Sequence, residues 1–293
     1  MPLSSALAPA PSRTVVSHPA PLPPVASINL LGVRISSLNL NEAVWRIVQA
    51  VQRRDKGYVC VCGAHGLVDC QADPELKQVF NGAFLATPDG MPLVWELHRQ
   101  GHSGAGRVYG PDLMLELFDQ GQQLGLRHYL YGATPKTLES LRCGLLKTSP
   151  EAQIVGSYAP PFRPLTEAEE REVAWMINDA APDIVWVGLS APKQERWMAR
   201  MRDKLEAPVL IGVGAAFDFH AGNMPQAPKW MQQAGLEWLF RLGAEPRRLW
   251  RRYFRVVPMY LYLLALQRLG LRRFPAPGTG PGTGSNTEPA APR

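Results

Sequence analysis

Short apolar runs along the chain alternate with longer segments in which apolar residues recur every three or four positions. The short runs are rich in β-branched and aromatic residues and predict strands, whereas the longer period predicts amphipathic helices. The predicted strands are Ile28–Ile35, Tyr58–Cys62, Phe84–Ala86, Arg127–Tyr131, Gln153–Ser157, Asp183–Val187 and Val209–Val213. The predicted helices are Asn41–Arg53, Pro74–Asn81, Pro92–Gln100, Asp112–Leu124, Thr137–Lys147, Glu167–Asn178 and Gln194–Lys204. This alternation predicts an α/β fold, Rossmann-like, with a mostly parallel sheet and helices on both faces.

The two ends of the chain do not follow this pattern. Residues 1–25 hold seven prolines, and residues 275–293 contain the run Pro-Gly-Thr-Gly-Pro-Gly-Thr-Gly. Such segments bury too little apolar surface to offset the entropy of ordering, so we expect disordered tails there. Between the tails we expect an α/β domain over residues 26–234 and a basic, amphipathic helical appendage over residues 235–274.

The N-terminal pattern does not predict a signal peptide, because it lacks a basic start and a continuous apolar stretch. No segment reaches the ~20 apolar residues that are needed to span a bilayer, so we expect a cytoplasmic body. The four cysteines form no Cys-x-x-Cys pair. Cys60 and Cys62 alternate within an apolar run, which favours buried thiols over a metal site.

Charge is concentrated near the C-terminus. The whole chain carries a net charge of +6, but residues 241–273 alone contain nine arginines and one acid, Glu245. One basic block on a slightly acidic body suggests a local anionic partner rather than nucleic acid. Within it, Val256–Leu266 has no polar side chain except two tyrosine hydroxyls, which suits a segment lying at an anionic membrane surface. A contact between protomers of a homo-oligomer is the alternative for this segment.

Ligands of such folds bind beyond the carboxyl ends of the strands, where this chain has glycine-containing turns. Gly132, Gly188 and Gly214 each follow a predicted strand, and the first two precede a predicted helix start that favours phosphate. Ordinary turn chemistry explains these glycines equally well. No G-x-G-x-x-G fingerprint, Walker motif, Gly-x-Ser-x-Gly elbow or His-Glu-x-x-His motif is present, which argues against dehydrogenases and P-loop kinases.

One carboxylate stands out at the end of a predicted strand. Thr87-Pro88-Asp89-Gly90-Met91-Pro92 leaves a short apolar strand and enters a helix. A carboxylate there can act as general base towards an attacking hydroxyl. The alternative is that Asp89 caps the helix that follows, as aspartate commonly does. The pattern alone leaves both interpretations open.

Several blocks of this sequence, in order, resemble the WecG/TagA/CpsF glycosyltransferase family (glycosyltransferase family 26). They are Thr-Pro-Asp-Gly-Met-Pro-Leu-Val-Trp from Thr87, Arg-Val-Tyr-Gly-Pro-Asp-Leu from Arg107, Gly-Leu-Ser-Ala-Pro-Lys-Gln-Glu from Gly188, Gly-Val-Gly-Ala-Ala-Phe-Asp from Gly212, Gly-Leu-Glu-Trp-Leu-Phe-Arg from Gly235 and Glu-Pro-Arg-Arg-Leu-Trp-Arg-Arg-Tyr from Glu245. The resemblance covers about residues 28–260. It implies an inverting, metal-independent enzyme at the inner face of the cytoplasmic membrane. Such an enzyme moves a sugar from a UDP-sugar to an undecaprenyl-diphosphate-linked sugar, for cell-surface polysaccharide or exopolysaccharide assembly.

The resemblance also implies roles for individual residues. It makes Asp89 the catalytic base and leads us to expect no cofactor and no metal. The sequence has no Asp-x-Asp triplet, so cations and backbone dipoles are expected to stabilise the departing UDP. Substrate contacts are expected from Arg107, Asp112, Gly132, Gly188, Lys193, Gln194, Asp218, Arg241, Arg248 and Arg251. For Arg107 the alternative is a surface ion pair, and for Lys193 and Gln194 it is ordinary polarity at a helix start.

The family pattern breaks after the second predicted strand. Family members often carry Thr-x-Asn there, whereas this chain has Val-Cys-Gly-Ala-His-Gly over residues 61–66. His65 is a candidate substitute for the lost hydrogen-bonding groups, although a structural histidine is the simpler interpretation. The donor sugar therefore stays open between N-acetylmannosamine-type sugars and glucose. The lost motif also keeps open a non-catalytic, membrane-associated nucleotide-sugar sensor or scaffold.

Overall fold

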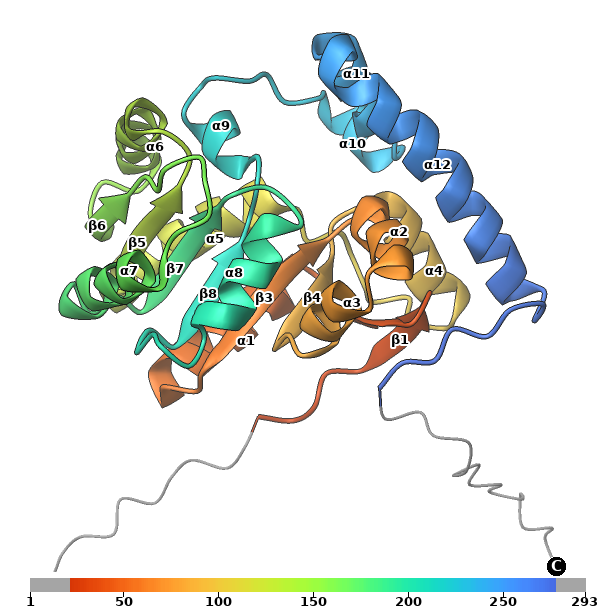
Figure 1. The fold of residues 1–293 in the computed structure, drawn as a ribbon, viewed down its shortest axis with the longest axis horizontal. Helices are drawn as coiled ribbons and strands as arrows, with labels where there is room; N and C mark the ends of the chain where they lie inside the picture. The colour runs from red at the N-terminus through yellow and green to blue at the C-terminus, as the bar shows by residue number, and fades with distance from the viewer. Residues whose placement is uncertain (1–21, 278–293) are drawn as a thin grey trace, which may run out of the picture.

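The computed structural model describes residues 22–277, which form a parallel sheet with helices packed on both faces (Figure 1). The sheet has six strands in the order β4-β3-β8-β7-β5-β6, and every neighbouring pair is parallel. The strands are β3 (Gly57–Cys62), β4 (Leu85–Pro88), β5 (Arg127–Gly132), β6 (Gln153–Tyr158), β7 (Ile184–Gly188) and β8 (Val209–Gly212). The predicted α/β class is confirmed, because parallel neighbours require crossover connections that cover the sheet with helices.

Two apolar clusters, one on each face of the sheet, hold this body together. One face packs against α1 (Leu40–Arg53), α5 (Gly110–Leu124) and α6 (Pro135–Thr148). The other packs against α2 (Ala64–Ala72), α3 (Pro74–Asn81), α4 (Met91–Arg99), α7 (Glu167–Asp179) and α8 (Lys193–Met201). All seven predicted helices are present. Helix α2 was not predicted, because Gly63 and Gly66 give its first turn the composition of a loop.

The first predicted strand is wrong in its extent. Ile28–Ile35 is not one strand but an antiparallel hairpin of β1 (Ser27–Leu30) and β2 (Val33–Ser36). Leu31 and Gly32 form the turn, with φ values of 54° and 85° that suit a tight two-residue hairpin. The apolar residues on both sides of this turn are buried, which made the segment look like one continuous run.

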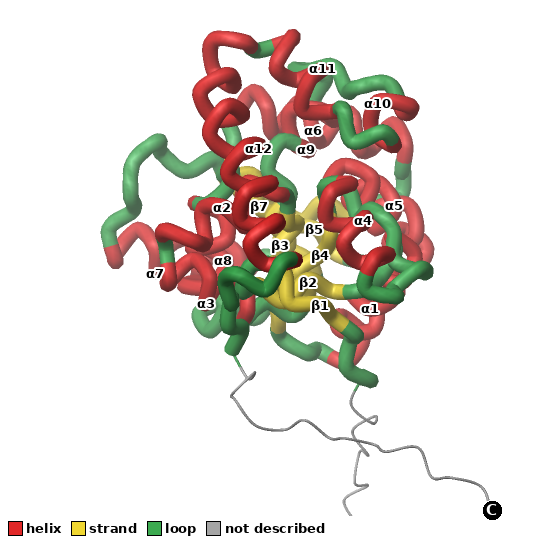
Figure 2. Tube along the Cα trace, turned by 90° about the vertical axis from the view of Figure 1, so that its right-hand side faces the viewer, coloured by secondary structure: helices red, strands yellow, loops and turns green. Residues whose placement is uncertain are grey.

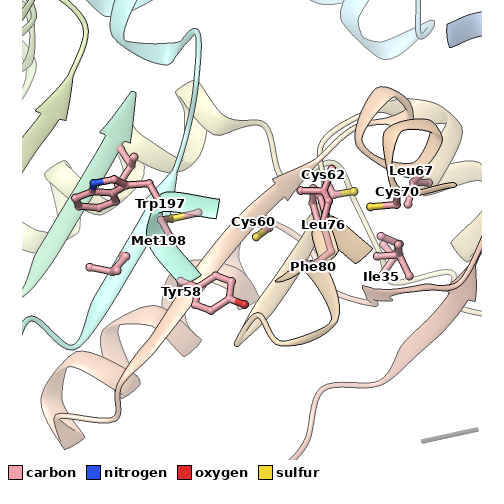
Figure 3. Packing of buried hydrophobic residues seen from close by; sticks show 14 of the residues in the cluster. Ile35, Tyr58, Cys60, Cys62, Leu67, Cys70, Leu76, Phe80, Trp197 and Met198 are labelled. Atoms are coloured by element: carbon pink, nitrogen blue, oxygen red, sulfur yellow. The ribbon is translucent and has the colours of Figure 1, made fainter. Parts of the chain in front are cut away.

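The predicted buried thiols are confirmed. Cys60, Cys62 and Cys70 are buried and unpaired in the cluster beneath α2, α3 and α8, where Figure 3 shows Cys62 and Cys70 near Leu67. Cys143 is exposed and also unpaired. The three buried thiols therefore act as small apolar groups in the core.

The C-terminal residues form three helices on the same side of the molecule as α2 (Figures 1 and 2). After the short α9 (Ala216–His220), the chain continues through α10 (Lys229–Gln233) and α11 (Glu237–Ala244) into α12 (Pro246–Arg268). Residues Val256, Tyr260, Leu263 and Leu264 of α12 are buried in the same cluster as α2. No helix among the described residues is long and apolar enough to cross a membrane.

The far end of α12 is attached to the N-terminal hairpin. Gln267 accepts a hydrogen bond from Leu31 N and donates one to Asn29 O, both at 2.9 Å. Asn29 Nδ2 donates to Phe274 O at 2.8 Å. The helix therefore lies across the body as a strap, joined to it along its length and at its end.

The predicted tails lie mainly outside the described residues. Within the described part, Arg46 Nη1 donates to Pro23 O at 2.9 Å, and Ala276 is buried. The chain therefore already contacts the body at residue 23 and still does so at residue 276.

Candidate active site

Two adjoining cavities open at the carboxyl ends of the strands. The β5–β7 cleft has a volume of about 500 Å³ and is lined by residues 131–137, 160–165, 188–200, 214, 217 and 218 in part. The Asp89 pocket, of about 280 Å³, lies beside it and is bounded by β3, β4, β8 and the C-terminal helices. Ser190, Gly214 and Asp218 line both cavities. A ligand of nucleotide-sugar size therefore has room to extend from one cavity into the other.

The β5–β7 cleft has the features of an anion-binding site. Helix α8 begins at Lys193 on its edge, and its second and third turns add Arg196 and Arg200 to the lining. A helix N-terminus and cationic side chains both favour a phosphate group. Ser190 holds a left-handed backbone conformation with φ of 66° just before this helix, a conformation that non-glycine residues rarely adopt.

The predicted glycines have different roles. Gly188 lines the cleft, but a Cβ atom added there would lie 2.5 Å from the Phe217 ring. Gly132 is not part of the lining: a Cβ there would lie 2.6 Å from Gly188 O on the neighbouring strand. Gly132 therefore allows β5 and β7 to approach each other, and the structure places it behind the site.

Gln194 lies at the start of α8, on the wall of the Asp89 pocket. Its side chain is buried and lines the Asp89 pocket, with Nε2 donating to Glu195 Oε1 at 3.0 Å. Its Oε1 has no hydrogen-bond partner among the described residues. A buried amide oxygen without a partner is costly, so this atom is a plausible acceptor for a ligand hydroxyl or N–H group. Burial raises the pKa of the adjacent Glu195 to about 7.

Asp89 follows β4 at the edge of its pocket, and its backbone N–H donates to Cys62 O at 2.9 Å. The helix-cap interpretation is wrong, because Gly90 is the N-cap of α4 and no side chain caps that helix. Asp89 Oδ1 has no hydrogen-bond partner among the described residues. Removal from solvent raises the pKa of Asp89 to about 6, against the opposing effects of Arg107 and Arg241. A half-buried carboxylate of this basicity suits a general base.

Arg107 is not among the residues that line either cavity. Its guanidinium donates to Asp89 O, to Glu237 Oε2 at 2.5 Å and to Gln232 Oε1 at 3.2 Å. It also lies 4.0 Å from the centroid of the Tyr109 ring. The surface ion pair considered from the sequence is thus replaced by a part-buried contact between the β4–α4 loop and the C-terminal helices. Asp112, in the first turn of α5, is exposed and also lies outside both linings.

His65 lies beside Asp89 in the pocket. A Cβ atom added to Gly63 would lie 3.1 Å from His65 Nδ1 and 3.9 Å from Asp89 Oδ2. Removal from solvent, with the nearby Arg252 and Arg241, lowers the pKa of His65 to about 3. The imidazole is therefore neutral at pH 7 and has one donor and one acceptor nitrogen.

Arginines from the C-terminal helices line the pocket opposite Asp89. Arg241 of α11, Arg248 of α12 and Arg252 of α12 lie there. Arg251 does not line the pocket; its guanidinium lies 5.4 Å from the centroid of the exposed Trp250 ring. Arg252 was missed, although its position four residues after Arg248 places the two on one face of a helix.

The acids that pair with the basic block come from the body as well as from Glu245. Glu245 does pair with Arg248, but Asp69 of α2 pairs with Arg255 at 3.1 Å and Glu96 of α4 pairs with Arg268. These acids come from the body, so the sequence near the arginines gave no sign of them. Glu237 was also missed, as a carboxylate of the pocket wall.

The site thus combines a carboxylate with a raised pKa, Asp89, with the neutral hydrogen-bonding groups of Gln194 and His65. Three arginines line the same pocket. Lys193 and Asp218 lie in the β5–β7 cleft, and Asp218 also reaches the Asp89 pocket. Among residues 22–277, no three His, Cys, Asp or Glu side chains are grouped so that they could hold a metal ion. This arrangement is suited to deprotonating a hydroxyl beside a bound anionic group.

Comparison with known proteins agrees with this chemistry. Residues 28–274 match the family model described as "Glycosyl transferase WecG/TagA/CpsF family". The chain is 30% identical over 193 residues to an N-acetylglucosaminyldiphosphoundecaprenol N-acetyl-beta-D-mannosaminyltransferase of Bacillus spizizenii, covering 66% of this chain and 72% of that protein. The family match spans almost the whole described part of the chain, including both cavities and α12. The protein therefore belongs to the WecG/TagA/CpsF family and is a glycosyltransferase.

Proposed function

We propose that the protein transfers a sugar from a UDP-sugar to an undecaprenyl-diphosphate-linked N-acetylglucosamine, with inversion at the anomeric carbon. The acceptor is proposed from the name of the B. spizizenii relative, which also supports N-acetylmannosamine as the transferred sugar. Glucose remains the second candidate. The observation that carries the proposal is Asp89, a carboxylate with a raised pKa that lines the same pocket as three arginines.

The nucleotide is proposed to occupy the β5–β7 cleft, with its diphosphate at the edge shared with the Asp89 pocket. The N-terminus of α8 and Lys193 are available there on one side. Arg241, Arg248 and Arg252 are available on the other. In a site shielded from water, fixed dipoles and cations stabilise the charge that develops on the departing UDP, which is the role we assign to them in place of a metal.

The proposed reaction is a single displacement. The carboxylate of Asp89, which lines the pocket, accepts the proton of the acceptor hydroxyl. The hydroxyl oxygen bonds to the anomeric carbon as the bond from that carbon to the β-phosphate oxygen breaks. The bonding electron pair leaves with UDP. Attack occurs on the face opposite the leaving group, so the configuration inverts.

We place the working enzyme at the inner face of the cytoplasmic membrane, where a lipid-linked acceptor is presented. The outer side of α12 supports this position, because Phe254, Leu261 and Tyr262 are 58–72% exposed. Arg251 lies on the same exposed surface, whereas Arg255, which is also exposed, pairs with Asp69 of α2. An exposed apolar row beside arginines is typical of a helix that lies in an anionic lipid interface. Whether the segment also joins protomers in a homo-oligomer stays a prediction.

The test is a transfer assay with a panel of UDP-sugars and a short-chain diphosphate-linked N-acetylglucosamine acceptor. We expect transfer from one donor, undiminished by EDTA, with the opposite anomeric configuration in the product. Asp89→Asn should lower kcat by about 10²–10⁴-fold while UDP binding is kept. Asp179→Asn, which makes the same change at an exposed position at the end of α7, serves as the control.

Two outcomes would contradict the proposal in different ways. Tight UDP-sugar binding without turnover on any donor would favour the sensor or scaffold. An unchanged rate in Asp89→Asn would keep the transferase but reject Asp89 as its base.

A further inference from the structure

We propose that Glu237 of α11 is a positioning residue for the base, because it holds the Arg107 guanidinium away from the Asp89 carboxylate. This inference rests on the proposed role of Asp89 and adds a residue to it. Two carboxylates compete here for a single guanidinium. The geometry assigns the closer contact to Glu237 and leaves Asp89 free for the acceptor hydroxyl.

The distances show which carboxylate holds the guanidinium. Arg107 Nη2 lies 2.5 Å from Glu237 Oε2 but 3.7 Å from Asp89 Oδ1. The second contact is an ion pair without a hydrogen bond, since Asp89 Oδ1 has no hydrogen-bond partner among residues 22–277. Arg107 Nε instead donates to the backbone oxygen of Asp89, which fixes the position of the loop and leaves Oδ1 of the carboxylate without a hydrogen bond from the described residues.

Three further contacts hold Glu237 and Arg107 in place. Tyr109 OH donates to Glu237 Oε1 at 3.2 Å, and Gln232 Oε1 accepts from Arg107 Nη1 at 3.2 Å. The Tyr109 ring lies against the guanidinium plane at 4.0 Å from centroid to Cζ. The side chains of Glu237 and Arg107 are only 14% and 16% exposed. A contact so well shielded from water is stronger than a surface ion pair.

The remaining charged and titratable groups around Asp89 come from every element that borders the pocket. The strand end and helix start beside it contribute Cys62 and a neutral His65. The α9 and C-terminal helices contribute Asp218, Arg241, Arg248 and Arg252. Among all the charged groups around Asp89, Arg107 and Arg241 lower its pKa, whereas Glu237 raises it. Besides Asp89 itself, Glu237 is the carboxylate of this pocket that contacts Arg107.

The consequence is a prediction with a definite sign. In Glu237→Gln, the negative charge is lost and the guanidinium is free to bond to Asp89 Oδ1. Both changes favour the ionised carboxylate, so the pKa of Asp89 should fall and the base should become weaker. An Asp89 carboxylate bonded to Arg107 also competes with the acceptor hydroxyl. We expect kcat to fall about ten- to a hundredfold, while KM for the donor changes less than about twofold.

The experiment compares wild type, Glu237→Gln, Glu237→Asp and Glu167→Gln by two readouts. Glu167→Gln makes the same chemical change at a carboxylate that is 94% exposed and lines neither cavity. The first readout is kcat/KM against pH. The second is the titration of the Asp89 carboxyl by NMR in protein labelled with ¹³C at aspartate carboxyls, assigned with Asp89→Asn. The second readout does not need turnover, so it still tests the inference if no donor supports transfer.

Support requires that the acid limb of the pH profile and the NMR titration of Asp89 both move to lower pH in Glu237→Gln. In Glu237→Asp, which keeps the charge, both readouts should stay closer to those of wild type. In Glu167→Gln both readouts should equal those of wild type. A lower rate in Glu237→Gln with an unmoved Asp89 titration would overturn the inference and leave Glu237 a purely structural role. If Glu237→Gln does not fold, Glu237→Asp decides: its shorter side chain should loosen the contact with Arg107 and move the Asp89 titration part of the way to lower pH, and an unmoved titration would overturn the inference.

Discussion

The two walls of the active site are built differently. The wall made by the ends of β3, β4, β7 and β8 contributes backbone, glycines, Gln194 and the carboxylate of Asp89. The facing wall, made by α11 and α12, contributes Arg241, Arg248, Arg252 and Glu237. The strand wall is thus fixed by the sheet, whereas the charged wall depends on a helix that follows all six strands in the chain.

The difference shows which part of the molecule supplies the positive charge that would bind an anionic substrate. A parallel sheet supplies short turns and helix N-termini, which suit a nucleotide. The cations that face the diphosphate in our proposal come instead from the C-terminal strap. The same helix has an apolar inner side against α2, at Tyr260 and Leu263, and an apolar outer side at Phe254 and Leu261. It therefore joins the core, the pocket and the proposed membrane surface.

The largest expected effect tests whether α12 is part of the body. Leu263 is 3% exposed against the core, whereas Leu261 is 58% exposed on the outer side. Leu263→Ala should lower the free energy of unfolding by about 2–5 kcal/mol, because it leaves a cavity in the core. Leu261→Ala should change it by less than about 0.5 kcal/mol. Urea unfolding measures both, and equally small effects would mean that α12 is a detachable appendage.

The next effect concerns the side of α12 that carries the functional charge. Arg252 lines the pocket, but Arg251 lies against Trp250 outside it. Arg252→Gln should cost about 1.5–3 kcal/mol of transition-state stabilisation, which is about a ten- to a hundredfold loss in kcat/KM. Arg251→Gln should leave turnover of a soluble, short-chain acceptor within about twofold. A reversed result would assign the diphosphate to the outer side of the strap.

The strand wall can be tested by pH. Asp89 has a pKa of about 6 in the folded protein, against an ordinary value of 3.8 for an aspartate. As a base it must be ionised, so kcat/KM should fall about tenfold per unit below pH 6 and level off above it. The raised pKa also means that folding is favoured while Asp89 is protonated, and that this advantage is lost as the pH rises through about 6. Asp89→Asn should therefore raise the melting temperature at pH 8 more than at pH 4.

The smallest expected effect concerns the outer side of α12. Phe254 is 72% exposed there, and Trp175 of α7 is 66% exposed on a different helix. Phe254→Ser should weaken binding to vesicles containing anionic lipid by about fivefold, since a side chain only partly buried in the interface loses part of its transfer energy. Trp175→Ser should not change it. Equal effects in vesicle co-sedimentation would contradict a specific membrane-facing side.

Most strands and helices of the fold could be predicted from local patterns in the sequence. The alternation of apolar runs and helical periods located all six strands of the sheet, because a strand buried on both faces is apolar throughout. The prediction failed where a turn lay within an apolar run and where glycines lay at the start of a helix. The hairpin at Leu31 and Gly32 was hidden by apolar residues on both sides, and α2 was hidden by Gly63 and Gly66.

Part of the candidate site could be predicted from the sequence in the same way. Asp89, Gly188, Lys193, Gln194 and Asp218 follow strands, and parallel topology brings the carboxyl ends of those strands to one edge. The contacts that side chains make away from that edge could not be predicted from the sequence. The sequence does not state that Arg107 turns towards Glu237, 130 residues away, or that Gly132 packs against Gly188.

By itself, then, the sequence determined the α/β class, the strands, the base candidate and the presence of a basic C-terminal block, because each depends on residue type and short-range spacing. Only the tertiary structure decided which arginine of that block faces the pocket and which acids pair with the others. It also decided that Glu237, rather than Asp89, binds Arg107 most closely. Those outcomes depend on how a late helix packs on the body, and the partners lie too far apart in the chain for any local pattern to encode them.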